Sequence, residues 1–242
     1  MYNLKYNLII LGVGMNNVLS QMFDTLWVNN EFLKAIWETI YLTIISTLFA
    51  YVIGLPLGII LNVTSKTGIK ANKWINYILS FIVNIFRSIP FIVLMVAVLP
   101  VSKLIVGTSL GNKAMIVTLV IAAAPYFARM VESSLKEVDF GVVEAAKSMG
   151  ASNWQIIYKV LLPEAKPSLV VGAVISIVTV IGYTAMANTI GGGGLGALAI
   201  TYGHQRGNSD IIWFCVLLIV IIVQVIQELG MLLSRKIDKR IK

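Results

Sequence analysis

Residues 211–233 read IIWFCVLLIVIIVQVIQELGMLL, and Glu228 is the only charged residue among them. The hydrocarbon core of a bilayer is about 30 Å thick, and a helix needs roughly 20 mostly apolar residues to cross it. This stretch therefore predicts a membrane-spanning helix. Apolar and polar residues do not alternate strictly along it, which disfavours a strand of a closed barrel. The segment accordingly predicts an all-α integral membrane protein.

Four other stretches are long and apolar enough to cross a bilayer, at about 35–61, 75–99, 114–130 and 168–190. Three of the five predicted spans contain a proline, namely Pro56, Pro90 and Pro125. Proline inside a membrane helix frees a backbone carbonyl, which neighbouring helices or water must satisfy. Gly54 and Gly58 also have the spacing that lets a second helix approach closely. We therefore expect a five-span bundle around a pathway.

The composition of the whole chain agrees with a membrane environment. Of its 242 residues, 58% are hydrophobic and only 12% are charged, against about 25% charged in soluble domains. The mean hydropathy is +0.87. Charge this sparse does not cover the surface of a soluble protein of this size, which excludes a secreted enzyme, a cytosolic enzyme and a disordered tail.

The net charge of +8 indicates orientation and not nucleic-acid binding, because the basic residues lie between apolar segments and form no continuous patch. Segments that follow alternate spans hold most of the lysines and arginines, and the positive-inside rule predicts that these segments are cytoplasmic. With five spans, the N-terminus is then outside and the basic tail, residues 234–242, is inside. The basic residues of these segments are Lys66, Lys70 and Lys73, then Lys136, Lys147, Lys159 and Lys166, and finally Arg235, Lys236, Lys239, Arg240 and Lys242.

Residues 1–33 are predicted to form an external N-terminal extension, either with an interfacial helix or as a short membrane-dipping segment. Cys215 is the only cysteine, so the chain forms no internal disulfide, and we expect Cys215 to be a small packing residue. His204 is the only histidine and has no neighbouring ligand set, so we expect no metal centre.

The predicted cytoplasmic segment 136–167 is much longer than the other loops. A short helix is expected from Val142 to Met149, with Gly150 as its C-cap. A second helix is expected from Trp154 to Leu162, stopped by Pro163. Because this insert completes no span, its apolar residues need a partner, most simply a soluble subunit.

The same segment resembles the EAA loop of type I ABC importer permeases. The resemblance rests on Glu144, Ala145, Ala146 and Gly150, followed by Val160, Leu162 and Pro163, with Val160 where the family has Ile. It implies that the short helix is a coupling helix that docks into a groove of a cytoplasmic ATPase. An ordinary amphipathic hairpin is the structural alternative.

Residues 84–92 resemble amino-acid-type permeases of this family. Residues 123–132, and residues 182–186 with Gly191 to Gly196, resemble its methionine-uptake branch specifically. The resemblance covers about residues 35–233 and leaves out the N-terminal extension. It implies the type I importer transmembrane fold, a multi-pass protein of the bacterial inner membrane, a homodimer with a pathway on its two-fold axis, and an external methionine-binding protein.

Two sequence patterns bear on nucleotides. The chain contains no P-loop, so ATP and Mg²⁺ are expected on a separate ATPase chain and no cofactor on this one. Gly191, Gly193 and Gly196 have the spacing of a dinucleotide-binding loop, but they follow a membrane span and Asp210 comes too early for the acidic partner. A flexible external loop is the preferred interpretation.

Four residues are candidates for the pathway or its gate. Tyr183, Thr184 and Met186 lie midway to late in the fourth span, where helix packing is the competing interpretation. Arg87 has either a pathway role or a structural one as a snorkelling or paired residue near the cytoplasmic end of the second span. Arg129 and Glu132 are three residues apart and are expected to pair.

These features predict a permease subunit, and not an enzyme, of an ATP-driven importer that carries D- or L-methionine, or both, into the cytoplasm. A permease of the same architecture for another small amino acid or solute is one alternative. A membrane scaffold without transport activity is the other.

Overall fold

The structure, a computed structural model, describes residues 30–238, and throughout this range the regular elements are helices. Four long helices occupy predicted spans one, three, four and five. The four helices are α2 (Glu31–Thr64), α5 (Gly111–Lys136), α9 (Lys166–Thr184) and α11 (Ser209–Ile237). Residues 1–29 of the predicted N-terminal extension lie outside the described residues. The last residues of that prediction, 31–33, belong to the start of α2.

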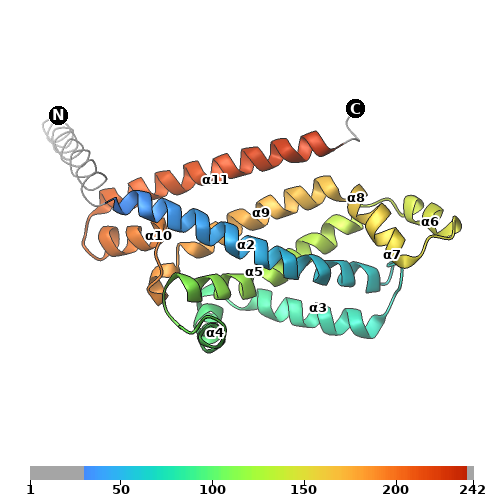
Figure 1. Cartoon of the computed structure of the whole chain (residues 1–242), viewed down its shortest axis with the longest axis horizontal. Coiled ribbons are helices and arrows are strands. Elements are labelled where there is room, and N and C mark those ends of the chain that lie inside the picture. Colours follow the sequence, from blue (N-terminus) through green and yellow to red (C-terminus); the bar gives the residue numbers. More distant parts are fainter. Residues whose placement is uncertain (1–29, 239–242) are drawn as a thin grey trace, which may run out of the picture.

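The centre of the bundle is the contact between α2 and α5, which lie alongside each other (Figure 1). Gly54 and Gly58 face α5 so closely that a Cβ on Gly58 would lie 2.6 Å from the carbonyl oxygen of Ala128. One helical turn before Gly54, Tyr51 packs edge-on against Phe127 of α5, with ring centroids 5.5 Å apart. The close approach predicted from the two glycines is therefore confirmed.

The predicted second span, 75–99, is not one continuous helix. It is divided into α3 (Lys73–Ser88) and α4 (Phe91–Val106), which are bent by 110° relative to each other. Ile89 is extended because a residue before proline is restricted to such conformations, and Pro90 caps the start of α4. As a result α3 lies in the plane of Figure 1 while α4 is seen nearly end-on.

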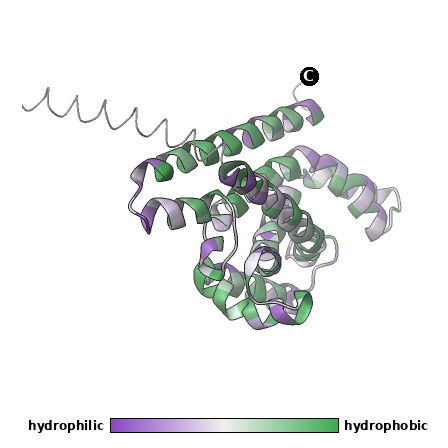
Figure 2. Cartoon of the chain, turned by 60° about the vertical axis from the view of Figure 1, so that its left-hand side comes forward, coloured by the Kyte–Doolittle hydropathy of each residue, from purple (hydrophilic) through white to green (hydrophobic). Residues whose placement is uncertain are grey.

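Helix α11 is hydrophobic along most of its length (Figure 2), and the described chain leaves most of its residues exposed or half-buried. Only Cys215 and Ser234 of its residues are buried, and Cys215 packs in a cluster with Phe32 and Leu195, as expected for a packing residue. An apolar helix exposed in this way requires lipid around it. Four described helices are long and apolar enough to cross a membrane, and the bent pair makes five. The fold is that of a multi-pass helical membrane protein.

Short helices form both ends of the bundle (Figure 1). The α6 end consists of α6 (Phe140–Ser148), α7 (Asn153–Ile156), the π-helical segment η1 (Ile157–Leu161) and α8 (Leu162–Glu164). The opposite α10 end consists of the 3₁₀ segment η2 (Ala187–Ile190), α10 (Leu195–Leu198) and the π-helical segment η3 (Ala199–His204). The fourth span thus ends at Thr184, and not at residue 190 as predicted.

Candidate functional site

Local capping fixes the two short helices of the α6 end. The Asp139 carboxylate accepts a hydrogen bond of 2.6 Å from the Gly141 N–H at the start of α6. Ser152 and Gln155 form a reciprocal capping box at the start of α7. Gly150 follows α6 with φ +80°, the left-handed conformation that terminates helices, and no atom within 4 Å opposes a side chain there. The sharp turn predicted at Gly150 is present.

The predicted coupling residues do not all face the same way. Glu144 and Ala145 are exposed, and so is Gly150. Ala146 is instead buried and packs with Val143 in a cluster that includes residues of α5 and of the segment after α7. Ala146 therefore packs α6 against the bundle, and its side chain is not exposed on the surface of α6.

The second helix of this segment does not stop at Pro163, as the sequence analysis predicted. It widens into η1 and continues through α8 to Glu164. The Leu162 N–H bonds to the carbonyl of Ile157, five residues earlier, which accommodates a proline that lacks an N–H and crowds the preceding turn. Leu162 is half-buried against the cluster of the α6 end, and Pro163 is exposed.

Large apolar side chains stand exposed at the α6 end, and the sequence analysis did not single them out as binding residues. Met149 is 81% exposed and Trp154 is 73% exposed. Phe140 and Tyr158 are also exposed. Aromatic and methionine side chains are enriched in protein interfaces. The sequence did contain a signal for such a binding surface, because these large apolar residues lie among lysines and serines in a segment that does not span the membrane.

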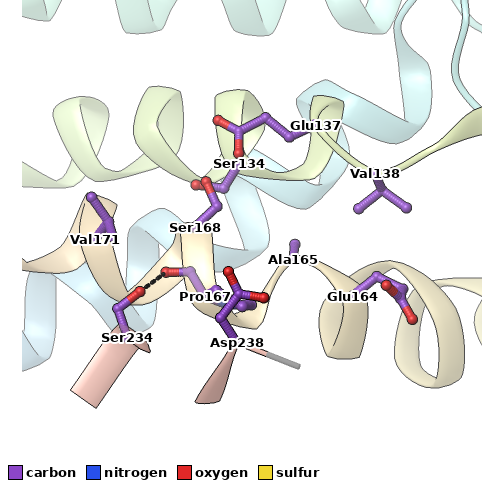
Figure 3. A pocket seen from close by; sticks show the side chains of 10 residues that line it. All are labelled: Ser134, Glu137, Val138, Glu164, Ala165, Pro167, Ser168, Val171, Ser234 and Asp238. Atoms are coloured by element: carbon purple, nitrogen blue, oxygen red, sulfur yellow. Dashed lines mark hydrogen bonds between the residues drawn. The ribbon is translucent and has the colours of Figure 1, made fainter. Parts of the chain in front are cut away.

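A cavity of about 320 Å³ lies at the α6 end between the last turn of α5, the α8–α9 junction and the end of α11 (Figure 3). The Ser234 hydroxyl donates a 3.0 Å hydrogen bond to the carbonyl of Pro167, which holds α11 against the start of α9. Glu137, Glu164 and Asp238 line the cavity. Among residues 30–238, no group of three or more potential ligand side chains is arranged to hold a metal ion.

An ion-pair network joins α5 to α3 near the same end. Arg129 pairs with Glu132 at 2.5 Å, as predicted, and Lys136 pairs with the other carboxylate oxygen at 2.6 Å. Arg129 also donates to Asn84 Oδ1 at 2.9 Å. Because Glu132 is buried, these partners neutralise a charge that would otherwise be costly. The network fixes α3 against α5.

Arg87 lies at the far end of α3 from the basic loop, immediately before the bend. Its guanidinium is 5.8 Å from the centroid of the Tyr126 ring on α5. Across the bend, Phe91 of α4 stacks on Tyr183 of α9, with centroids 4.3 Å apart and planes 5° apart. Helices α3, α4, α5 and α9 thus contribute one cation and three aromatic rings to the same region.

Two features of the described chain stabilise the charge of Arg87, namely the C-terminal end of the α3 dipole and the ring of Tyr126. An arginine at the centre of a membrane helix costs about 2.5–3.5 kcal/mol on insertion scales. The negative end of the α3 dipole offsets about 0.3–1 kcal/mol of this. Arg87 does not lie near the basic end of α3, as the structural interpretation assumed, so snorkelling to that surface is excluded.

The other two pathway candidates differ in exposure. Thr184 is buried and its hydroxyl donates a 2.7 Å bond to the carbonyl of Ile181, which favours the packing interpretation for this residue. Met186 is 38% exposed at the start of η2. Of the three candidates at the end of the fourth predicted span, Tyr183 and Met186 are therefore more accessible than Thr184.

The glycine-rich segment at the α10 end is held by hydrogen bonds, contrary to the flexible loop that was expected. The N–H of Gly194 donates to Glu38 at 2.9 Å, and that of Gly193 donates to Asn112 Oδ1 at 2.7 Å. Asn112 in turn donates to Glu38 at 3.2 Å, and the Leu195 N–H donates to Thr39 at 2.9 Å. A Cβ on Gly193 would collide with the Glu38 carboxylate. The glycines allow this close approach and form no nucleotide-binding loop.

The fold and these sites define a multi-pass helical membrane protein. It has a region of arginine and aromatic side chains at the bend between α3 and α4, and exposed apolar side chains at one end. Comparisons with known proteins give the family. The family described as "Binding-protein-dependent transport system inner membrane component" matches residues 54–242. This chain belongs to that family and is a transport permease.

Individual proteins match over nearly the whole chain. The "Probable D-methionine transport system permease protein MetI" of Vibrio cholerae is 48% identical over 225 residues, 93% of this chain and 99% of that protein. The "Methionine import system permease protein MetP" of Bacillus subtilis is 48% identical over 222 residues, 90% of this chain and 100% of that protein. A solved structure described as "Inward facing conformations of the MetNI methionine ABC transporter" matches with a TM-score of 0.84 and 45% identity, covering 86% of this chain and 96% of that one.

Proposed function

We propose that this chain is the membrane-spanning subunit of an ATP-driven importer that carries methionine, as the D- or L-isomer or both, into the cytoplasm. The observation that supports methionine as the substrate is the similarity, over nearly the full length, to permeases named for methionine in Vibrio cholerae and Bacillus subtilis. The chain itself contains no P-loop, so ATP and Mg²⁺ belong to a separate ATPase chain.

The proposed orientation places the α6 end in the cytoplasm of a bacterial cell, with the chain in the inner membrane. The loop between α2 and α3, the α6 segment and the end of α11 all carry lysines or arginines. Cytoplasmic segments of membrane proteins carry such an excess of basic residues. The N-terminus is then outside and the C-terminus inside.

The proposed docking surface for the ATPase is the exposed side of the α6 end. It combines Glu144, Ala145 and Gly150 with the exposed side chains of Met149 and Trp154. Bilayer lipid does not account for apolar exposure on a cytoplasmic segment, whereas a partner protein would cover it. Leu162 and Pro163 act indirectly, by shaping the helix that supports this surface.

The buried side of α6 provides a physical route from the ATPase to the bundle. Val143 and Ala146 pack in one cluster with Val131 and Leu135 of α5 and Leu161 of η1. Closure of the ATPase on ATP would move α6, and the packed cluster would pass that movement to α5 and α9. Coupling of this kind requires that nucleotide bind the two states of the permease with different free energies.

A second copy of the chain, an external methionine-binding protein and membrane lipid complete the proposed assembly. The described helices are few to enclose a gated route, and two-fold dimers are the commonest oligomers. The pathway would run along the bend between α3 and α4, beside Tyr183 and Met186. The binding protein would deliver methionine at the α10 end.

Reconstitution tests this function directly. The permease, its ATPase and the binding protein are placed in proteoliposomes, and uptake of labelled L- and D-methionine is measured with ATP and with ADP. We expect ATP-dependent accumulation of one or both isomers. Accumulation of a different amino acid, with no accumulation of methionine, would overturn the substrate assignment while leaving the transporter class intact.

A further inference from the structure

Arg87 is a charged residue at the last turn of α3, far along the helix from the basic loop. Arg87 lies fourteen positions after Lys73, which begins α3. At 1.5 Å per residue this is about 21 Å along the helix. Tyr126, over which it lies, is in the middle part of α5, far from both helix ends. Arg87 is therefore near the middle of the membrane-embedded part of the protein.

Arg87 has no counterion within residues 30–238. It forms no ion pair and no hydrogen bond there, and its side chain is exposed at the bend. Arg129 of α5 differs, because it pairs with the Glu132 carboxylate and donates a hydrogen bond to Asn84. Charged residues within membrane segments usually pair, or they face a water-filled path for a charged substrate.

We propose that Arg87 binds the α-carboxylate of the amino acid as it passes the bend between α3 and α4. The inference rests on the proposed function and adds a recognition residue to it. A guanidinium presents a planar fork of N–H donors that matches a carboxylate with two parallel hydrogen bonds. An amino acid in transit would supply the anion that Arg87 lacks among residues 30–238.

The surrounding rings suit the remainder of a thioether amino acid. Phe91 and Tyr183 form a stacked aromatic pair at the bend, and both Arg87 and Tyr126 lie near enough to Tyr183 to interact with it electrostatically. Thioether sulfur makes favourable contacts with aromatic rings. The region thus offers one donor fork for the carboxylate and apolar rings for the side chain.

The test uses the complete transporter in proteoliposomes and measures methionine uptake and ATP hydrolysis together. Arg87→Gln should lower methionine uptake per ATP hydrolysed by about tenfold or more, because the charge-assisted bonds are lost. Arg87→Lys should restore part of the uptake, since it keeps the charge and loses the fork. Lys103→Gln, which removes a positive charge from the exposed last turn of α4, is the matched control and should transport normally.

A second measurement identifies the carboxylate. Labelled methionine is bound to the permease–ATPase complex without the binding protein, and unlabelled methionine or methioninol, which lacks the carboxylate, is added as competitor. Methionine should compete about tenfold or more better than methioninol, and Arg87→Gln should remove this difference.

The outcomes separate the inference from the proposed function. If the unmodified transporter accumulates methionine but Arg87→Gln does so equally well, the inference fails and the function stands. Equal competition by methioninol, no displaceable methionine, or a dimer that dissociates on Arg87→Gln also overturns it, the last because Arg87 would then be an interface residue. If the unmodified transporter accumulates no methionine, the proposed function itself fails.

Discussion

The two ends of the bundle are both built from short helices. They differ in whether their backbone N–H groups and apolar side chains find partners within the chain. At the α10 end, the backbone N–H groups of Gly193, Gly194 and Leu195 find partners on α2 and α5, 81 to 156 residues away in the chain. At the α6 end, Met149 and Trp154 stand in solvent. The glycine segment of one end is held by bonds within the chain, whereas the other end exposes the surface that we propose for the ATPase.

This difference separates stability from assembly. Hydrogen bonds that a chain makes to itself contribute to its folding free energy, and removing one partner leaves a costly unsatisfied group. Exposed side chains contribute little to folding, but they contribute strongly to binding when a partner buries them. Mutations at the α10 end should therefore change stability, and mutations at the α6 end should change coupling.

Glu38→Ala is expected to have the largest effect. It removes the acceptor for Gly194 and Asn112 and should lower the free energy of unfolding by roughly 2–3 kcal/mol. Unfolding of the purified permease in detergent, followed by circular dichroism, measures this loss. Unchanged stability would show that the hydrogen bonds do not hold the α10 end.

Trp154→Ala should give the next largest effect, and only on assembly. Truncation of an interface hot spot costs about 2 kcal/mol, which is roughly a 30-fold loss in affinity. Titration of the ATPase onto permease held in nanodiscs measures this loss, and the unfolding midpoint should stay within experimental error. Normal affinity in this variant would remove Trp154 from the docking surface.

Gly150→Val should cost about 1–2 kcal/mol, because a β-branched residue is strained at a positive φ. The space around Gly150 is open, so the cost is conformational and not steric. Gly150→Asn, which tolerates this conformation better, is the matched control. We expect the Val variant to insert normally and to transport less methionine per ATP hydrolysed, whereas equal coupling in both variants would contradict the need for this turn.

Glu144→Ala should change stability least, within about 0.5 kcal/mol, because its side chain is exposed. It is the same substitution as Glu38→Ala at the opposite end. We expect its effect in the ratio of methionine uptake to ATP hydrolysis. A loss of stability as large as that of Glu38→Ala would break the distinction between the two ends.

Four of the five spans could be predicted as continuous helices from local sequence, but the effect of the prolines inside the three predicted spans that hold one could not. Pro56 and Pro125 lie within continuous helices, whereas Pro90 ends one helix and begins another. All three have the same local chemistry. Whether a proline is absorbed or breaks the span depends on what packs around it, which a single span does not specify.

The candidate sites were predictable to the same limited extent. The turn at Gly150 follows from local backbone chemistry and was predicted. The inward direction of Ala146 depends on which face of α6 packs on the bundle, and the fixation of Gly194 depends on a carboxylate 156 residues earlier. Contacts of this range leave no local pattern in the sequence.

The α10 end is held by bonds within the chain, whereas we propose that the α6 end docks the ATPase. Amide hydrogen exchange at the two ends, measured with and without the ATPase, tests this difference most directly. We predict that amides of Phe140–Ser148 exchange more slowly once the ATPase binds. The amides of Gly193, Gly194 and Leu195 should exchange slowly in both conditions, because their bonds lie within the chain. Protection that appears only at the α10 end, or nowhere, would contradict the assignment of the α6 end as the docking surface.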